Sequence, residues 1–492
     1  MFDGGIRHEV TESLIEIGLP AVRDPAFPGI PGRWNYRYAW YELGSSVTAI
    51  PFVLVGRALG HGSLESKQFA FSMTTVPFAA AVAAMLFLIY GRLGVPLKRA
   101  LAWALVFAFG TLMWPYAGSS FDAALQAFWL TLAVWSAVEA FDGGSIRWAV
   151  ASAIAFAMLI NVQEAYVVLV GCAAATAPLT LASVRQRLRD PLVIVVLAGG
   201  AAGLLLIAAA NFVRYGDPTN TGRMITTGTH PVFGNPVVGL AGLLISPAKS
   251  IFLYSPTCCL AVIGLLRLMK SDARRLAPIP ACLVLHLALI STLRFWHGEW
   301  AWGPRYLVAT LPLVSIGLPF ASRGSSLRRI VVAVCAVAVA VQVLAVSVDH
   351  QRYYFDRSLT PFFWLDESKM YTDSPLLARP RELALIARGT VVKHARALVP
   401  GPRPMSMTSS IFGPPAPQLA LGRLWTRQYV VFDVPRPWTF WGRQLPEEQR
   451  PGNIELMTIV GVIVAAAGFA ALGVVAFARG EPDFSAVAIP ES

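Results

Sequence analysis

The sequence has few charged residues, because only 14% of its 492 residues are Asp, Glu, Lys or Arg. A soluble globular chain carries about 25%. The mean hydropathy is +0.58, and several stretches approach the roughly 20 apolar residues that cross a bilayer as a helix. The scarcity of charge therefore excludes an ordinary soluble domain and predicts a polytopic membrane protein.

Cysteine is also scarce, and its five residues all lie in apolar runs: Cys172, Cys258, Cys259, Cys282 and Cys335. None has metal-ligand spacing, and an odd number cannot pair fully within one chain, so buried free thiols are predicted. The sequence contains no Walker loop, which argues against ATP-driven transport by this chain. Its net charge of +12 is scattered over short loops, which indicates membrane topology and not nucleic-acid binding.

The apolar runs predict an all-α, polytopic transmembrane helix bundle with about eleven spans. The spans are expected near residues 70–91, 99–116, 119–140, 147–162, 164–183, 192–212, 250–269, 277–294, 304–321, 329–348 and 455–478. The shorter segment 45–60 contains Pro51 and Arg57, and we expect an interfacial helix there. We divide the chain into an outer loop with juxtamembrane helices (1–68), a transmembrane core (69–348), an extracytoplasmic irregular segment (349–453) and a final span with a cytoplasmic tail (454–492).

Lys and Arg gather in alternate loops, namely Arg92/Lys98/Arg99, Arg147, Arg185/Arg187/Arg189, Arg267/Lys270/Arg274/Arg275 and Arg323/Arg328/Arg329. Cytoplasmic loops hold the Lys/Arg excess, so these loops are predicted inside and the connections between them outside. Residues 1–44 then lie outside, with neither a span nor a secretory signal before them. Either an upstream span is missing from this chain or 45–60 crosses the membrane.

Ionisable groups are almost absent from the predicted span interiors. His286 is the one near a midplane, and a packing role is expected for it. Ion-coupled transporters need charges or broken helices near the midplane, so this pattern argues against transport. The polar residues gather instead at the predicted outer edge: Asp3, Arg7, His8, Glu9, Glu12, Asp122, Gln126, Asn161, Glu164, Arg214, Lys249 and Arg305.

The outer connection WHGEWAWGPRYL (296–307) concentrates His297, Glu299, Arg305 and three tryptophans. Cations at headgroup depth suit a phosphate, carboxylates suit a general base or a metal, and tryptophans suit sugar rings. Together they predict a substrate with a lipid tail and a polar head. Each feature also has a simpler explanation, because Asp122 can cap its own helix and Lys249 and the tryptophans can anchor the interface.

A series of weak motifs in this order resembles the multi-spanning GT-C glycosyltransferases, in particular the bacterial glycosyltransferase-39 and protein-mannosyltransferase-like group. The motifs cover about residues 1–320 and are FDGGIRHEVTESLIEIGLPAVRD, NYRYAWYELGSSVTAIPFVLVGRALG, SSFDAALQAFWLTLAVW, NFVRYGDPTNTGR, GLLISPAKSIFLYSP and HGEWAWGPRYLVATLP. The segment 349–453 lies outside the match, and its aromatic residues favour a small irregular outer domain or a spacer with tryptophan anchors.

The resemblance implies an inverting transfer of a sugar from a polyprenyl-phosphate-linked donor at the outer face of the membrane. It implies a catalytic base in the first outer loop, for which Asp3 fits first and Glu9 second. It also implies that cations of later outer loops hold the donor phosphate: Arg305 first, then Lys249, Arg214 and Arg223. Asp122, Glu299, His297, Trp302 and Tyr306 are the further substrate-binding candidates.

The expected partners are that donor, a glycan, lipid or protein acceptor of the cell envelope, and membrane lipid, without nucleic acid. The resemblance places the chain in the bacterial plasma (inner) membrane with its active face extracytoplasmic. No cofactor is predicted; some members of the family use a divalent metal, but no residue cluster here is strong enough to predict one. A non-catalytic envelope-assembly scaffold and a lipid-linked glycan transporter remain the alternative functions.

Overall fold

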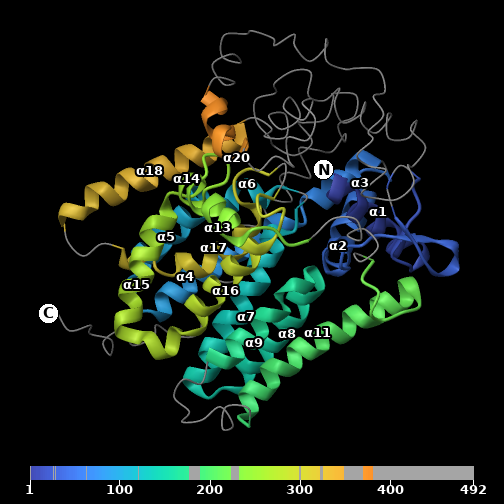
Figure 1. The fold of residues 1–492 in the computed structure, drawn as a ribbon, viewed down its shortest axis with the longest axis horizontal. Helices are drawn as coiled ribbons and strands as arrows, with labels where there is room; N and C mark the ends of the chain where they lie inside the picture. The colour runs from blue at the N-terminus through green and yellow to red at the C-terminus, as the bar shows by residue number, and fades with distance from the viewer. Residues whose placement is uncertain are drawn as a thin grey trace.

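The described residues fold mainly into helices joined by short connections (Figure 1). This computed structural model describes residues 2–25, 27, 29–62, 64–119, 121–176, 189–222, 232–298, 301–321, 325–347 and 369–380. Its first α-helices are α1 (Phe2–Ile17), α2 (Gly44–Leu59), α3 (Leu64–Ser72), α4 (Thr75–Arg92), α5 (Leu97–Gly110), α6 (Met113–Ala117), α7 (Ala123–Gly143), α8 (Ile146–Val162) and α9 (Val167–Thr176). The later ones are α11 (Pro191–Tyr215), α13 (Pro236–Ile245), α14 (Ile251–Tyr254), α15 (Thr257–Leu276), α16 (Pro278–Thr292), α17 (Leu311–Ser315), α18 (Ser325–Ser347) and α20 (Lys369–Thr372). Short 3₁₀-helices are η1 (Arg33–Asn35), η2 (Glu164–Tyr166), η3 (Arg305–Thr310) and η4 (Leu318–Phe320).

Within the described part of the chain, four helical stretches are long and apolar enough to cross a membrane: Ser66–Arg92, Ala123–Gly143, Pro191–Tyr215 and Arg328–Val346. The helices α15 and α16 form a further pair, bent by 105° at their junction. These helices confirm the predicted helical membrane fold, whereas the count of about eleven spans is not recovered. The predicted span 455–478 lies outside the described residues.

One of the predicted spans is not a continuous helix in the structure. The predicted span 304–321 is divided into η3, α17 and η4, with Pro312 and Pro319 at the starts of the last two. Proline lacks the backbone N–H that a continuing helix requires, so it favours the first turn of a new helix. The apolar composition of 304–321 therefore predicted a buried segment but did not show where its helix is interrupted.

A small sheet, which the sequence did not predict, lies beside α1. Its strands are β1 (Ala21–Val22), β2 (Ile30–Pro31) and β3 (Arg37–Tyr38), and the antiparallel order is β1-β3-β2. Arg37 donates from its guanidinium to the carbonyls of Phe27 and Asp24, at 3.2 and 3.1 Å. Strands of two residues are too short to produce a period-2 pattern, so the sequence carried no sign of them.

The long helix α11 begins and ends at residues that suit those positions. Asp190 accepts a hydrogen bond from the backbone N–H of Leu192 at 2.8 Å, and Pro191 follows in the first turn. Gly216 ends the helix with φ of 78°, a left-handed conformation that glycine adopts at little cost. Gly216 therefore sets the helix end that carries Arg214.

Helix α7 lies at the centre of the bundle (Figure 1). Helix α8 packs between α7 and α11, while α4 and η3 also contact α7. The N-terminal helices α1, α2 and α3 pack on one another, and α2 contacts α8. The predicted interfacial segment 45–60 thus forms the helix α2, which packs between α1 and the bundle. We call α1, α2, α3 and the small sheet with its loops (residues 2–72) the N-terminal layer.

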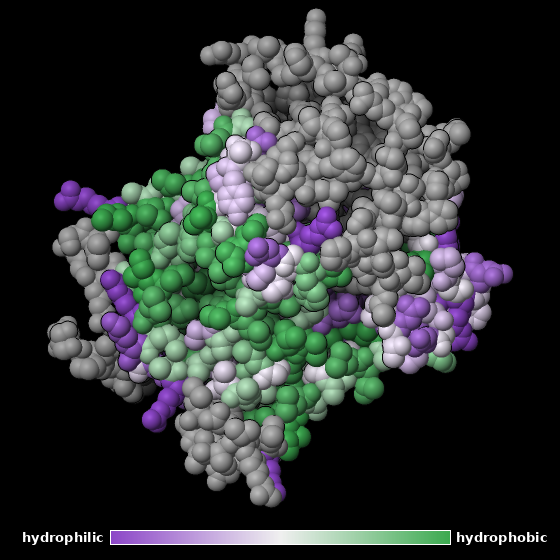
Figure 2. Space-filling model, in the orientation of Figure 1, coloured by the Kyte–Doolittle hydropathy of each residue, from purple (hydrophilic) through white to green (hydrophobic). Residues whose placement is uncertain are grey.

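The outer surface of the bundle is apolar. Figure 2 shows hydrophobic side chains over the middle of one face and hydrophilic ones over the small sheet. Val237, Leu266 and Val284 are more than half exposed on α13, α15 and α16. Side chains of this kind are stable there only against lipid or another apolar surface, as expected of a membrane helix bundle.

The two ends of α7 carry different ion pairs. At its last turns, Glu139 pairs with Arg275 at 3.3 Å and with Arg92 at 3.7 Å. Asp122 precedes its first residue. Two of the predicted Lys/Arg loop clusters therefore meet at one end of α7, and the candidate site residue Asp122 lies at the opposite end.

A close helix contact provides a test of this packing. A Cβ atom added at Gly264 in α15 would overlap the carbonyl oxygen of Gly317, which precedes η4. We expect Gly264→Ala to destabilise the fold by about 1–3 kcal/mol, because overpacking displaces backbone that cannot relax freely. Thermal unfolding in detergent would measure the change.

Gly91→Ala is the matched control, because a Cβ at Gly91 in α4 would have no neighbour within 4 Å. Alanine has the higher helix propensity, so this variant should keep or raise the melting temperature. Equal melting temperatures for the two variants would contradict the close approach of α15 to η4.

Candidate functional site at the start of helix α7

A buried ion pair joins the N-terminal helix to the start of α7. The Arg7 guanidinium lies 2.9 Å from the Asp122 carboxylate, and the two side chains are 8% and 11% exposed. Ser45, in the first turn of α2, donates a hydrogen bond to the same carboxylate at 3.4 Å. The Arg7 guanidinium also lies over the ring of Tyr41, at 4.7 Å. Asp122 is therefore contacted from α1 and from α2.

Arg305 contacts the residue that directly precedes Asp122. Its guanidinium lies 4.2 Å from the ring centre of Phe121 and 5.0 Å from that of Tyr306. It also donates to the Tyr306 hydroxyl at 3.2 Å. Phe121 and Asp122 are consecutive, so the aromatic contact of Arg305 and the ion pair of Arg7 fall on neighbouring residues.

A glycine shapes the loop that leads to Arg305. Gly298 has φ of 67°, and a Cβ there would lie 3.1 Å from the Cβ of Arg305. A larger residue would therefore meet both backbone strain and a crowded neighbour. The turn after His297 needs glycine in order to fold back against Arg305.

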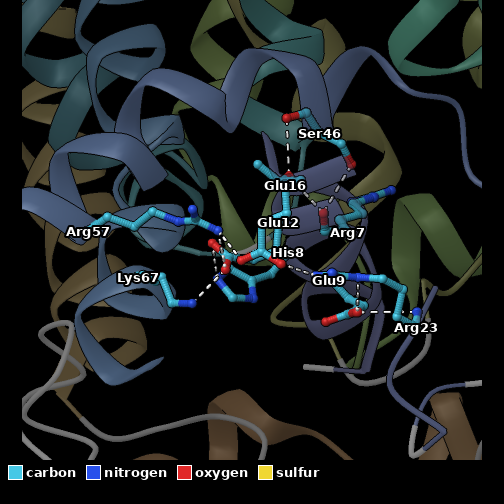
Figure 3. A network of polar contacts seen from close by, with 10 residues as sticks. Arg7, His8, Glu9, Glu12, Glu16, Arg23, Ser46, Arg57 and Lys67 are labelled. Carbon is cyan, nitrogen blue, oxygen red and sulfur yellow. Dashed lines mark hydrogen bonds and ion pairs between the residues drawn. The ribbon is translucent and has the colours of Figure 1, made fainter. Parts of the chain in front are cut away.

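A second group of charges, which we call the N-terminal charge network, lies among α1, α2 and α3 (Figure 3). It comprises His8, Glu12, Glu16, Arg23, Arg57 and Lys67. Glu12 accepts hydrogen bonds from Lys67 at 2.6 Å and from Arg57 at 2.9 Å. Burial alone would raise the pKa of Glu12, but the bonds from Arg57 and Lys67 outweigh it and hold that pKa below its ordinary value. The Glu12 carboxylate thus links α1 to α2 and α3.

Glu9, the second predicted base, is engaged in a turn. Its carboxylate accepts the backbone N–H groups of Arg23 at 3.2 Å and Asp24 at 3.3 Å, and it lies 3.7 Å from the Arg23 guanidinium. These contacts fix the chain directly after β1. Asp3, the first predicted base, lies in the first turn of α1, one turn before Arg7, and its side chain is outside the described part. Both catalytic roles stay predictions.

Lys249 and Trp302 form an internal wall next to this site. Both side chains are fully buried. Lys249 donates from Nζ to the carbonyl of Ala301 at 2.7 Å, and Tyr116 donates to the carbonyl of Trp302 at 3.0 Å. The Trp302 ring packs edge-on against Tyr254 at 5.1 Å. In this structure Trp302 is a packing residue and its ring has no open face for a sugar.

Arg214 holds the end of α11 to the N-terminal layer. It donates to the carbonyls of Ala39 at 2.7 Å and Tyr41 at 2.9 Å, and to the side chain of Asn211. Tyr41 is also the ring under Arg7. Arg214 therefore supports the Arg7 side of the site through Tyr41.

The structure thus brings together Asp122, Arg305 and Tyr306 from the predicted set. His297 is buried beside Trp296, with ring centres 5.6 Å apart. Glu299 and Arg223 lie outside the described residues. No role was predicted for Arg7, because its partner Asp122 lies 115 positions later in the chain and no local pattern relates the two residues.

The described residues contain no group of three His, Cys, Asp or Glu side chains placed to hold a metal ion. The carboxylates of Asp122 and Glu12 contact Arg and Lys side chains instead. The chemistry that this arrangement supports directly is the binding of an anion beside a carboxylate.

Comparison with known proteins identifies a structural likeness only. The chain matches no protein-family model and no curated protein by sequence. Its structure is similar to the crystal structure of ArnT from Cupriavidus metallidurans in the apo state, with a TM-score of 0.44 and 15% identity. The match covers 88% of this chain and 71% of that one. The likeness is distant, with a TM-score below 0.5.

His8 makes the stability of the N-terminal layer sensitive to pH. Burial lowers its pKa from 6.5 to about 4. The unfolded chain therefore binds a proton near pH 6.5, while the folded chain stays neutral at His8 until about pH 4. The stability that the buried, neutral His8 contributes is fully present above pH 6.5 and is lost as the pH falls toward 4.

We expect His8→Asn to reduce the fall in melting temperature between about pH 7 and 5, because asparagine does not take up a proton in this range.

His61→Asn is the control for this prediction, because His61 is exposed and Asn tolerates its positive φ of 49°. Melting curves of both variants and of the parent chain, recorded across that range, separate the two histidines. A decline that is unchanged in His8→Asn and reduced in His61→Asn would be inconsistent with a buried neutral His8.

Proposed function

We propose that this protein is a GT-C-type membrane glycosyltransferase that uses a polyprenyl-phosphate-linked sugar donor at the outer face of the bacterial plasma membrane. One observation carries the proposal: Arg305, Asp122 and Arg7, from three distant segments, converge at the start of α7. A cation beside a carboxylate, at the end of an apolar helix bundle, suits a donor whose tail stays in lipid. The order of the sequence motifs supports the same class of enzyme.

In the proposed reaction, an acceptor hydroxyl oxygen attacks the anomeric carbon of the donor sugar. The bond from that carbon to the phosphate oxygen breaks, and polyprenyl phosphate leaves with the bonding electrons. The hydroxyl proton passes to a carboxylate base. One displacement of this kind inverts the anomeric centre. Arg305 stabilises the negative charge that grows on the leaving phosphate, an interaction that strengthens in the transition state.

Asp3 is the proposed base, and Glu9 ranks behind it. The Glu9 carboxylate already accepts two backbone N–H groups near β1, so its use as a base would release that turn. Asp3 is one helical turn from Arg7, whose guanidinium reaches Asp122. Asp122 and Tyr306 are proposed to orient the polar head of the donor, with Arg7 holding Asp122 in place.

The acceptor is proposed to be a glycan, lipid or protein of the cell envelope. It would approach from the side of the N-terminal layer, where the small sheet presents polar side chains (Figure 2). Membrane lipid surrounds the apolar face of the bundle. A transporter is less well supported, because the interior of the central helix α7 carries apolar and small residues between Gln126 and Glu139.

The proposal is tested by sugar transfer from polyprenyl-phosphate-linked sugars in membranes that contain the full chain. We expect Arg305→Ala to lower transfer about 100-fold, the size of effect seen when one donor to a developing oxyanion is removed. Asp3→Asn should lower transfer to a similar or greater extent, because it removes the proton acceptor. Radiolabelled sugar in the acceptor fraction measures both.

Arg274→Ala is the matched control, since Arg274 is an exposed arginine at the far end of α15. It should transfer sugar at the parent rate. Full transfer by both Arg305→Ala and Asp3→Asn would contradict the proposed roles of these two residues. Absence of transfer by a correctly folded parent chain, with every donor tested, would favour the scaffold, whereas movement of the lipid-linked donor without transfer would favour a transporter.

A further inference from the structure

A short segment beyond α18 docks on the wall that adjoins the candidate site. It contains α20 and the turn of helix that follows Ser374, and we call residues 369–380 the docking segment. The amide of Ala248 donates to the carbonyl of Met370 at 3.3 Å, and the Ser374 hydroxyl donates to the carbonyl of Pro247 at 2.8 Å. Tyr371 donates to the carbonyl of Val238 at 3.1 Å. Backbone and side-chain bonds therefore attach this segment to α13 and to the residues before Lys249.

The docking segment carries a fully buried arginine next to its last residue. Arg379 is 0% exposed, and its guanidinium lies 5.4 Å from the ring of Trp302. The Tyr254 ring packs edge-on against Trp302 as well. Trp302 is thus held by an aromatic contact and by a cation–π contact. A desolvated cation–π contact is stronger than an exposed one, so Arg379 contributes substantially to fixing the position of the Trp302 ring.

The loop that Arg379 contacts leads directly to Arg305. Lys249 and Tyr116 bind the carbonyls of Ala301 and Trp302. The next residue, Gly303, has φ of 65°, and a Cβ there would lie 2.8 Å from the Tyr254 side chain. The backbone therefore turns in one restricted way between Trp302 and Arg305. A shift of the Trp302 ring would be transmitted over three residues to Arg305.

We propose that Arg379 is a positioning residue, which acts through Trp302 to fix the loop that holds Arg305 against Phe121. The inference rests on the proposed function of Arg305, but its structural part does not. It gives the docking segment, which no sequence motif covers, a role in the site: residues 369–380 clamp a loop more than sixty positions earlier in the chain. Arg379 itself needs no contact with the substrate.

Backbone hydrogen exchange of the full chain in lipid nanodiscs tests the structural part. Arg379→Gln should accelerate exchange in peptides that cover residues 301–307 about tenfold, since the lost cation–π contact is of that order. Arg379→Lys should give a smaller increase, because lysine keeps the charge but not the planar stacking. Leu377→Ala is the control: Leu377 lies on the same turn of helix and is 73% exposed, so residues 301–307 should exchange as in the parent chain.

A double-mutant comparison tests the link to Arg305. Arg379→Gln should lower sugar transfer about tenfold in the parent chain and leave the residual rate of Arg305→Ala unchanged, because both changes act on one interaction. A further tenfold loss in the Arg305→Ala background would overturn the proposal, since Arg379 would then act independently. Unchanged exchange over 301–307 in Arg379→Gln would also overturn it, whether or not the chain transfers sugar. Faster exchange in a chain that shows no transfer would refute the proposed function while leaving the clamp intact.

Discussion

The ion pair between Arg7 and Asp122 is the interaction on which the arrangement of the site depends. Each charge would be costly to bury alone, and removing one member of such a pair costs about 3–5 kcal/mol. The pair joins α1 to the start of α7, and Ser45 of α2 and Tyr41 complete its surroundings. It therefore sets the register of the N-terminal layer against the apolar bundle.

Apolar composition predicted the helical fold, and the membrane side assigned to each loop predicted which candidate residues gather at one edge of the bundle. The runs that contain α4, α7, α11 and α18 are long, apolar and nearly free of charge, so hydropathy located them directly. The convergence of Asp122 and Arg305 was predicted from their shared membrane edge. In both cases the information is local or depends only on which side of the membrane a loop lies.

Roles that depend on tertiary contacts could not be predicted in the same way. Glu9 is an outer acid in the predicted loop, but its contacts with the turn at Arg23 appear only once β1 has formed. Trp302 fits the pattern of an interfacial sugar-stacking residue, and the structure buries it completely. Arg379 is one of many arginines after residue 349, and nothing in its surrounding sequence relates it to Trp302. Tertiary packing decides which residues contact one another, and a single sequence does not show those contacts.

Arg214 sets an order of events during synthesis. Its two bonds to the carbonyls of Ala39 and Tyr41 span 175 and 173 residues. A ribosome adding about 5–20 residues per second needs on the order of 10 to 30 s to make that length. During this interval the loop that carries Tyr41 lacks its anchor, and the helix end that will hold it has not been made. The N-terminal layer therefore completes its assembly only after α11 has emerged, so a ribosome-bound fragment that ends before residue 214 contains the first half of the site without the support of its backbone.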